Sequence, residues 1–112
     1  MLLQVLITRD DDNLPELLSG FMEVGIHGSS VLDCEGALQV LGHSDMEDFP
    51  MFGALRQFLN PNSVTGKMVL TVLSEKRLED SRQVIHRSIG DLNKPGTGIV
   101  FTIEIGNVEG YK

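Results

Sequence analysis

The stretch that most constrains the fold is Glu23–Gly36, which reads Glu-Val-Gly-Ile-His-Gly-Ser-Ser-Val-Leu-Asp-Cys-Glu-Gly. Gly25 follows an apolar helical repeat, at the position where helices commonly end in a left-handed residue, a conformation that costs most residues about 1–2 kcal/mol. Gly28 permits a second sharp bend, and Val31 with Leu32 indicates a short apolar strand. The stretch therefore predicts the end of a helix, a sharp turn and a strand. Gly36 follows this strand and begins a long connection.

Three further apolar runs and a second helical repeat complete the predicted elements. Leu2–Thr8 and Lys67–Leu73 have the composition of strands, and Ile99–Ile105 alternates along its length in the manner of a strand. Asn13 and Ser74 precede the two helical repeats as N-cap residues. The predicted order is strand, helix, strand, strand, helix, strand.

This order is typical of the ferredoxin-like α+β fold, a sandwich of one antiparallel sheet and two helices, and residues 1–112 suffice for a single such domain. Two helices can cover only one face of the sheet. The other face would still be mostly apolar, more than a small monomer usually exposes to water, so we expect oligomerisation. The sequence leaves open which of the two faces is uncovered. The first alternative is the face that contains Leu2, Leu6, Val69, Leu73 and Val100 with Gln4, Thr71, Thr102 and Glu104. The second alternative, with the faces exchanged, is the opposite face.

Residues 37–66 form a connection too long for a hairpin, which favours a functional element. Asp48 is a good helix N-cap, and Pro61 follows the end of a near-helical apolar repeat. We therefore predict an ordered helix over about residues 50–59, with Phe52 and at least one of Phe49, Leu55 and Phe58 largely buried. The repeat consists of Phe49, Phe52, Leu55, Phe58 and Leu59.

The composition argues against several classes of partner. A net charge of −7, with scattered lysine and arginine residues, argues against nucleic acid binding. No apolar run approaches the roughly 20 residues of a membrane span, and the opening Met-Leu-Leu-Gln lacks the basic start of a signal peptide. The single cysteine, Cys34, is typical of a reducing compartment. We expect a cytoplasmic protein with no nucleic acid partner and no membrane insertion.

Patterns for catalysis and metal binding are weak. His27, Cys34 and His43 are of types that a borderline metal accepts, but no pair has a recognised ligand spacing. No nucleophile elbow, paired-carboxylate signature or phosphate-loop lysine motif is present. We therefore expect neither an enzyme nor a metal site. The second helical repeat also contains four polar residues, which we interpret as a solvated helix face and not as a site. They are Asp80, Arg82, His86 and Arg87.

Two glycine patterns resemble those of the PII nitrogen-regulatory signal-transduction family. The family pattern Glu-Val-Gly-Ile-x-Gly-x-x-Val, followed by Gly and then Gly-His, is present at Glu23–Val31, Gly36 and Gly42–His43. Lys94–Phe101 reads Lys-Pro-Gly-Thr-Gly-Ile-Val-Phe and is similar to the family's Lys-Ile-Gly-Asp-Gly-Lys-Ile-Phe. With the order of elements, the resemblance covers the chain except the connection and the C-terminal tail. It implies a homotrimer that binds ATP or ADP, often with 2-oxoglutarate, between subunits and signals through a long loop.

The resemblance also implies where a small-molecule effector and an unidentified target protein would bind, in a regulator of nitrogen or carbon metabolism. Ser30 would stand at the place of an adenine-contacting threonine, and Gly36 at the base of the loop. The predicted ligand-binding residues are Ser30, Gly36, Ala37, Leu38, Lys94, Gly96, Thr97 and Gly98. The predicted partner-binding residues in the loop are Phe49, Phe52 and Arg56.

The chain also departs from the family pattern at the phosphates. Ile99 replaces a phosphate-contacting lysine, Leu38 and Val40 replace a glycine and a glutamine, and the family's C-terminal arginine pair has no counterpart. Two or three charge-assisted contacts worth about 1.5–3 kcal/mol each are missing, so we expect ATP to bind roughly a hundredfold or more weakly than to an ordinary member. The cofactor is therefore left unidentified, with an adenine nucleotide as one option. The alternative function is that of a CutA-like trimeric metal-binding protein, which shares the trimer without these glycine motifs.

Overall fold

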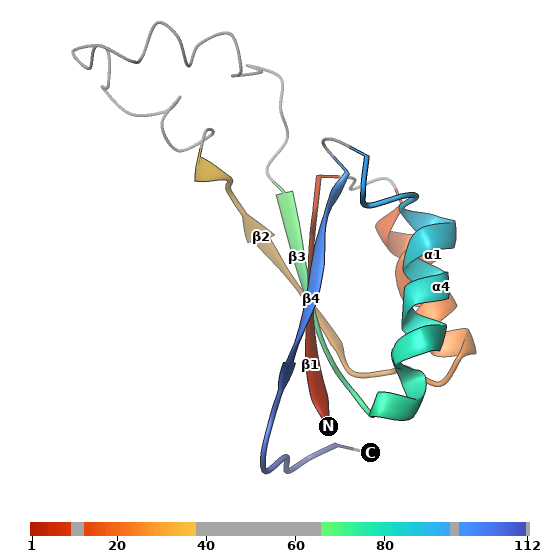
Figure 1. Ribbon diagram of the computed structural model, residues 1–112, viewed down its shortest axis with the longest axis vertical. Coiled ribbons are helices and arrows are strands. Elements are labelled where there is room, and N and C mark those ends of the chain that lie inside the picture. Colours follow the sequence, from red (N-terminus) through yellow and green to blue (C-terminus); the bar gives the residue numbers. More distant parts are fainter. Residues whose placement is uncertain (10–12, 38–65, 95–96, 112) are drawn as a thin grey trace, which may run out of the picture.

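The computed structural model describes residues 1–9, 13–37, 66–94 and 97–111. The strands form one antiparallel sheet in the order β2-β3-β1-β4, and both helices lie on the same side of it (Figure 1). This architecture is α+β and compatible with the ferredoxin-like class that the sequence predicts. Within the described residues, no helix has both the length and the apolar character needed to cross a membrane. In chain order, the elements are β1 (Leu2–Thr8), α1 (Leu14–Glu23), β2 (Ser29–Cys34), β3 (Gly66–Leu73), the 3₁₀ turn η1 (Glu75–Arg77), α4 (Leu78–Ser88) and β4 (Gly98–Glu104).

The observed boundaries of the strands agree with the predicted boundaries to within about one residue. β1 has the predicted bounds, β3 and β4 each begin one residue earlier than predicted, and β2 contains the predicted Val31 and Leu32. Asn13 and Ser74 precede the first helix and η1, yet neither side chain makes a capping hydrogen bond. The predicted helix over residues 50–59 and the burial of Phe52 lie outside the described residues.

The corner after α1 is built around Gly25 as predicted. Gly25 has φ +82°, and its N–H bonds to the Met22 carbonyl at 3.1 Å. The Ile26 N–H bonds to the Phe21 carbonyl at 2.8 Å, which completes a Schellman motif. The Arg77 guanidinium lies against Gly25 and donates to the Val24 carbonyl, so a cation sits at the negative end of α1. Gly28 differs from the prediction, because its φ is not positive and its corner needs no glycine.

These two glycines give a matched pair of alanine substitutions. Gly25→Ala should lower the free energy of unfolding by about 1–3 kcal/mol, because it adds left-handed strain and a Cβ only 2.9 Å from the Arg77 guanidinium. Gly28→Ala, whose nearest neighbour would be a carbonyl oxygen at 3.9 Å, should leave stability unchanged or raise it by about 0.4–1 kcal/mol. Urea denaturation followed by circular dichroism measures both. Equal losses in the two variants would contradict this account.

The hydrophobic core lies between the helices and the sheet. Gly20 lets α1 approach α4 closely, since a Cβ there would come within 2.7 Å of Val84 Cγ1. On α4 the buried residues are Ser81, Val84, Ile85 and Ser88. Leu78 and Ile89 lie at the two ends of α4 and are only half-buried. The core cluster consists of Leu6, Leu14, Leu17, Phe21, Ile26, Val69, Val84 and Ile85.

The sheet face beneath the helices carries several buried polar side chains. Gln4, Thr8 and Thr71 are each no more than 1% exposed. The Ser81 hydroxyl of α4 donates to Gln4 Oε1 at 2.8 Å, which satisfies a buried amide oxygen. Ser88, on the same face of α4, is also buried, but its hydroxyl has no hydrogen-bond partner among the described residues. The two serines therefore have opposite energetic roles.

The same substitution at the two serines should give opposite results. Ser81→Ala leaves the Gln4 amide oxygen buried without a donor and should lower the free energy of unfolding by about 1–3 kcal/mol. Ser88→Ala removes an unpaired buried hydroxyl in a residue that is 6% exposed, so it should be neutral or stabilising by up to about 1 kcal/mol. Thermal unfolding of both variants tests the difference. A Ser88→Ala variant as unstable as Ser81→Ala would show that Ser88 has a partner of its own.

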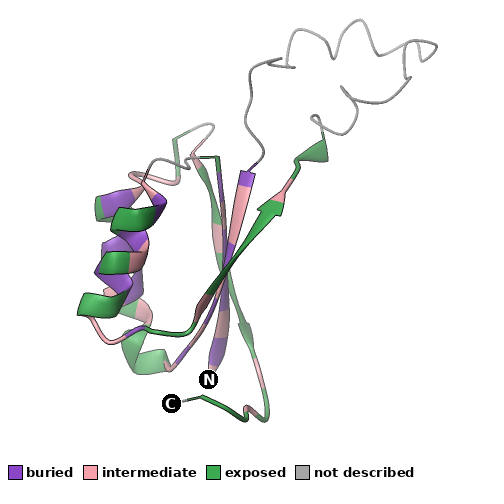
Figure 2. Cartoon of the chain, turned by 180° about the vertical axis from the view of Figure 1, so that it is seen from behind, coloured by how far each residue is buried: buried purple, intermediate pink, exposed green. Residues whose placement is uncertain are grey.

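The opposite sheet face, here called the open face, carries almost entirely apolar side chains, and neither of the described helices, α1 and α4, lies on it. The strand register assigns to it the residues Leu3, Val5, Ile7, Ser30, Leu32, Cys34, Met68, Leu70, Val72, Ile99, Phe101 and Ile103. Leu32, Ile99, Phe101 and Ile103 are 43–56% exposed. The two edge strands that carry them, β2 and β4, are largely exposed in Figure 2, while the central strands are largely buried.

Of the two face assignments left open by the sequence, the first is wrong and the exchanged one is correct. Leu2, Leu6, Val69 and Leu73 face the helices and are at most 6% exposed. β1 and β2 run parallel, as do β3 and β4, because each pair flanks an antiparallel neighbour. Each helix is therefore the crossover of a parallel pair. Chain handedness, and not the apolar content of a face, decides which side such crossovers cover.

Candidate functional site

The predicted ligand-binding segments meet the sheet at the same end but at opposite edges. Cys34, two residues before Gly36, pairs with Gly66 at the end of β3, and Gly98 pairs with Thr8 at the end of β1. β2 and β4 are separated by β3 and β1, which corresponds to three strand spacings or about 14 Å. Within one subunit, Gly36 and Gly98, as described residues of these two segments, therefore do not lie side by side.

The Thr97–Gly98 segment is held tightly against β1. Gly98 has φ +145°, and a Cβ on it would overlap the Ile7 carbonyl oxygen and lie 3.2 Å from Thr8 Cα. The Thr8 hydroxyl donates to the Thr97 carbonyl at 3.1 Å. The Thr97 N–H bonds to the Lys94 carbonyl at 3.4 Å, and the Lys94 side chain is exposed. Close backbone approach to β1 is sufficient to require glycine at position 98.

The residues predicted on β2 and beyond it are spread apart. Ser30 is exposed on the open face and pairs with Leu70, about 10 Å along the strands from the Gly98 row. Gly36 and Ala37 are exposed at the end of β2. The Lys67 ammonium and Asp33 carboxylate form an ion pair near them. The other predicted positions, outside the described residues, are Leu38, Gly96, Phe49, Phe52 and Arg56.

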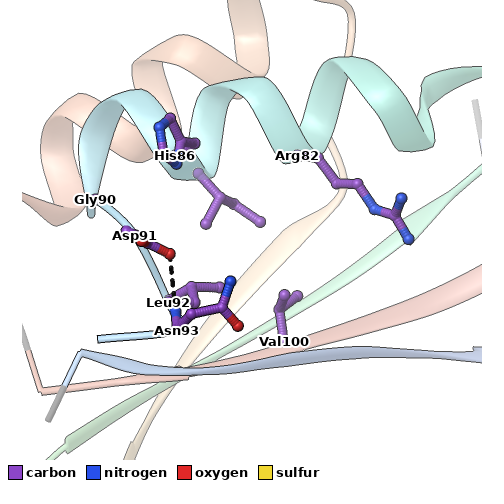
Figure 3. A pocket seen from close by; sticks show the side chains of 8 residues that line it. Arg82, His86, Gly90, Asp91, Leu92, Asn93 and Val100 are labelled. Carbon is purple, nitrogen blue, oxygen red and sulfur yellow. Dashed lines mark hydrogen bonds between the residues drawn. The ribbon is translucent and has the colours of Figure 1, made fainter. Parts of the chain in front are cut away.

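A cavity of about 460 Å³ lies between α4, the loop that follows it and the edge strand β4 (Figure 3). The sequence patterns did not indicate it, because the polar residues of α4 read as one solvated face. In the fold these residues separate: Arg82 and His86 line this cavity, while Arg87 lies in another hollow beside α1. The available signal was the four-residue spacing of Arg82 and His86 ahead of a glycine turn. The lining residues are Arg82, Ile85, His86, Gly90, Asp91, Leu92, Asn93 and Val100.

The described part of the chain contains no group of three or more histidine, cysteine, aspartate or glutamate side chains arranged to hold a metal ion. His27 is exposed and Cys34 is half-buried on the open face, whereas His43 lies outside the described residues. Cys34 Sγ lies close to Gly66, since a Cβ on that glycine would come within 3.3 Å of the sulfur. Packing therefore explains the half-buried thiol.

Comparison with known proteins adds no assignment. No family model matches the chain. No curated protein matches it significantly.

Proposed function

We propose that the chain is a PII-like regulatory protein: a homotrimer that senses a small ligand in the clefts between subunits and regulates a target protein through residues 37–66. The observation that carries this proposal is the open face. Burying a large apolar side chain gains about 1.5–3 kcal/mol, and this face offers Leu32, Ile99, Phe101 and Ile103 still 43–56% exposed. A partner subunit is the occupant that we propose for it.

The polarity of the two sheet faces supports self-association. The two described helices, α1 and α4, cover the face that contains Gln4, Thr8 and Thr71, and they do not cover the more apolar face. Exposed apolar patches of this kind commonly mark protein interfaces. A subunit that functioned alone would gain more by covering the open face.

The separation of the predicted ligand residues supports a site shared between subunits. The Gly36 end of β2 and the Gly98 end of β4 are about 14 Å apart across the sheet, yet both project from the same end of it. A ligand that touches both segments would do so only where the β2 edge of one subunit meets the β4 edge of the next. The cleft between subunits is therefore the proposed sensing site.

Light scattering combined with a thermal-shift panel tests the proposal. We expect a trimer at micromolar concentration and stabilisation by a nucleotide, 2-oxoglutarate or bicarbonate. A ligand present at about 100 times its dissociation constant adds about 2.7 kcal/mol, which is readily detected. ATP should need a concentration at least roughly a hundredfold higher than for a family member that retains the phosphate contacts. A monomer would overturn the proposal, and a shift with divalent metals alone would favour the CutA-like function.

A further inference from the structure

The cavity beneath α4 combines an apolar floor with a polar rim. Ile85 is 2% exposed and belongs to the core cluster, and Leu92 and Val100 pack against that cluster. In Figure 3, Val100 projects from the sheet edge toward α4, and Leu92 lies on the loop below the helix. A volume of about 460 Å³ falls within the range of about 300–1,000 Å³ typical of small-molecule pockets. The floor therefore suits a compact apolar group.

Arg82 and His86 supply the donors on the helix side of the cavity. They are four residues apart on α4, so their side chains leave the helix on the same face, with Cβ atoms about 6 Å apart. In the described ranges neither side chain has an ion pair or hydrogen bond to another residue. The chain has a net charge of −7, so acidic side chains are plentiful, yet this guanidinium is uncommitted.

Asp91 limits the charge that the cavity can accept. Its Oδ1 accepts the Asn93 N–H at 3.0 Å, which fixes the carboxylate in the turn opened by Gly90 at φ +106°. A fixed negative charge at one side disfavours dianions such as phosphate monoesters. One permanent cation, Arg82, matches one carboxylate, and a guanidinium binds that group with two parallel hydrogen bonds.

We propose that this cavity binds a small monocarboxylic acid with a branched or ring-shaped apolar body. The carboxylate binds at Arg82, with His86 as a second donor, and the body rests on the apolar floor. The Asn93 side chain, on the opposite side of the cavity, is available to a polar substituent of the acid. All of the residues that line the cavity belong to one subunit, so binding there does not require the trimer.

The test is a titration of the ¹⁵N-labelled full chain with 4-methylpentanoate, monitored by amide chemical shifts. We expect shifts at Gly90, Leu92 and Val100 with a dissociation constant of about 1 mM or tighter. The isosteric 4-methylpentanamide, which lacks the charge, should bind about tenfold more weakly, and acetate, which lacks the body, should not bind measurably.

Two variants with the same change of charge provide the control. Arg82→Gln should weaken binding of 4-methylpentanoate about tenfold or more, since it removes the charge-assisted contact. Arg87→Gln, on the same helix but outside the cavity, should leave the affinity within about twofold.

Four outcomes would overturn the proposal. They are the absence of any shift near 1 mM, equal affinity for the acid and the amide, equal losses in the two variants, and shifts confined to the open face. Shifts confined to the open face would identify non-specific apolar binding. If an acidic peptide and not 4-methylpentanoate produced the shifts, the cavity would be assigned to a protein partner. A monomeric chain that still binds 4-methylpentanoate here would refute the trimer while sustaining this site.

Discussion

Replacing Gly98 with alanine is expected to lower the free energy of unfolding by about 3–5 kcal/mol. The first contribution is backbone strain, about 1–3 kcal/mol, because φ +145° is a conformation that residues with a Cβ rarely adopt. The second is overpacking, about 1–3 kcal/mol, because the new Cβ would overlap the Ile7 carbonyl oxygen. Relief requires β4 to move away from β1 at the Thr8 row, with loss of ladder hydrogen bonds. Urea denaturation monitored by circular dichroism measures the effect.

Gly106→Ala is the matched control. Gly106 follows the same strand, is exposed, and would place its Cβ more than 4 Å from any neighbouring atom. Its stability should stay within about 0.5 kcal/mol of the unsubstituted chain. The pair separates two explanations for the glycine at position 98. A Gly98→Ala variant that keeps full stability but loses effector binding would show that the glycine serves a ligand rather than the approach to β1.

Local sequence patterns were sufficient for the strands and for the helices α1 and α4 of the described residues. Gly25 and Gly90 mark the ends of α1 and α4, and each has a positive φ in the structure. The long apolar runs predict the strands because five or more residues with matching composition leave little ambiguity. The interpretation of Gly28 was wrong because it depended on a single residue. A glycine indicates that the backbone can adopt a positive φ at a position, but it does not show that the fold uses this conformation.

The sequence could not decide which face of the sheet the helices cover. Both faces of β1 are apolar, with Leu3, Val5 and Ile7 on one and Leu2 and Leu6 on the other. The handedness of the crossovers decides on which side of the sheet the helices lie. The strand register then decides which residues point to that side, since a shift of one residue exchanges the two faces. Neither the handedness nor the register is visible in the amino-acid composition.

Candidate sites were harder to predict than strands for a related reason. The family resemblance includes both Ser30 and Gly98, but the strand order puts them on opposite edges of the sheet. Patterns within single segments do not predict the strand order. The cavity at Arg82 and His86 depends on how α4 lies over β4, a tertiary contact between segments separated by the loop. Its apolar floor consists of residues that sequence patterns assign to the core.

The open face gives the prediction with the largest functional effect, which concerns Phe101. Phe101→Lys should abolish the proposed trimer at micromolar concentration and weaken assembly at least about a hundredfold. The ring is 43% exposed in the single subunit, so the isolated fold tolerates its removal. An ammonium buried without a partner costs several kcal/mol, and losing the ring forfeits a further 1.5–3 kcal/mol or so, against about 1.4 kcal/mol for each factor of ten. Sedimentation velocity over a range of concentrations gives the change.

Thr102→Lys is the control for Phe101→Lys. Thr102 is the next residue of β4, is also exposed, and points to the opposite face of the sheet, beside the helices. The two variants therefore add the same charge to opposite faces of the same strand, and only Phe101→Lys also removes an aromatic ring. We expect Thr102→Lys to remain trimeric, with both variants retaining the circular dichroism of the folded chain. Trimers of equal strength in the two variants would show that the open face is not the interface, and assembly would then have to use the exposed edges of β2 and β4 instead.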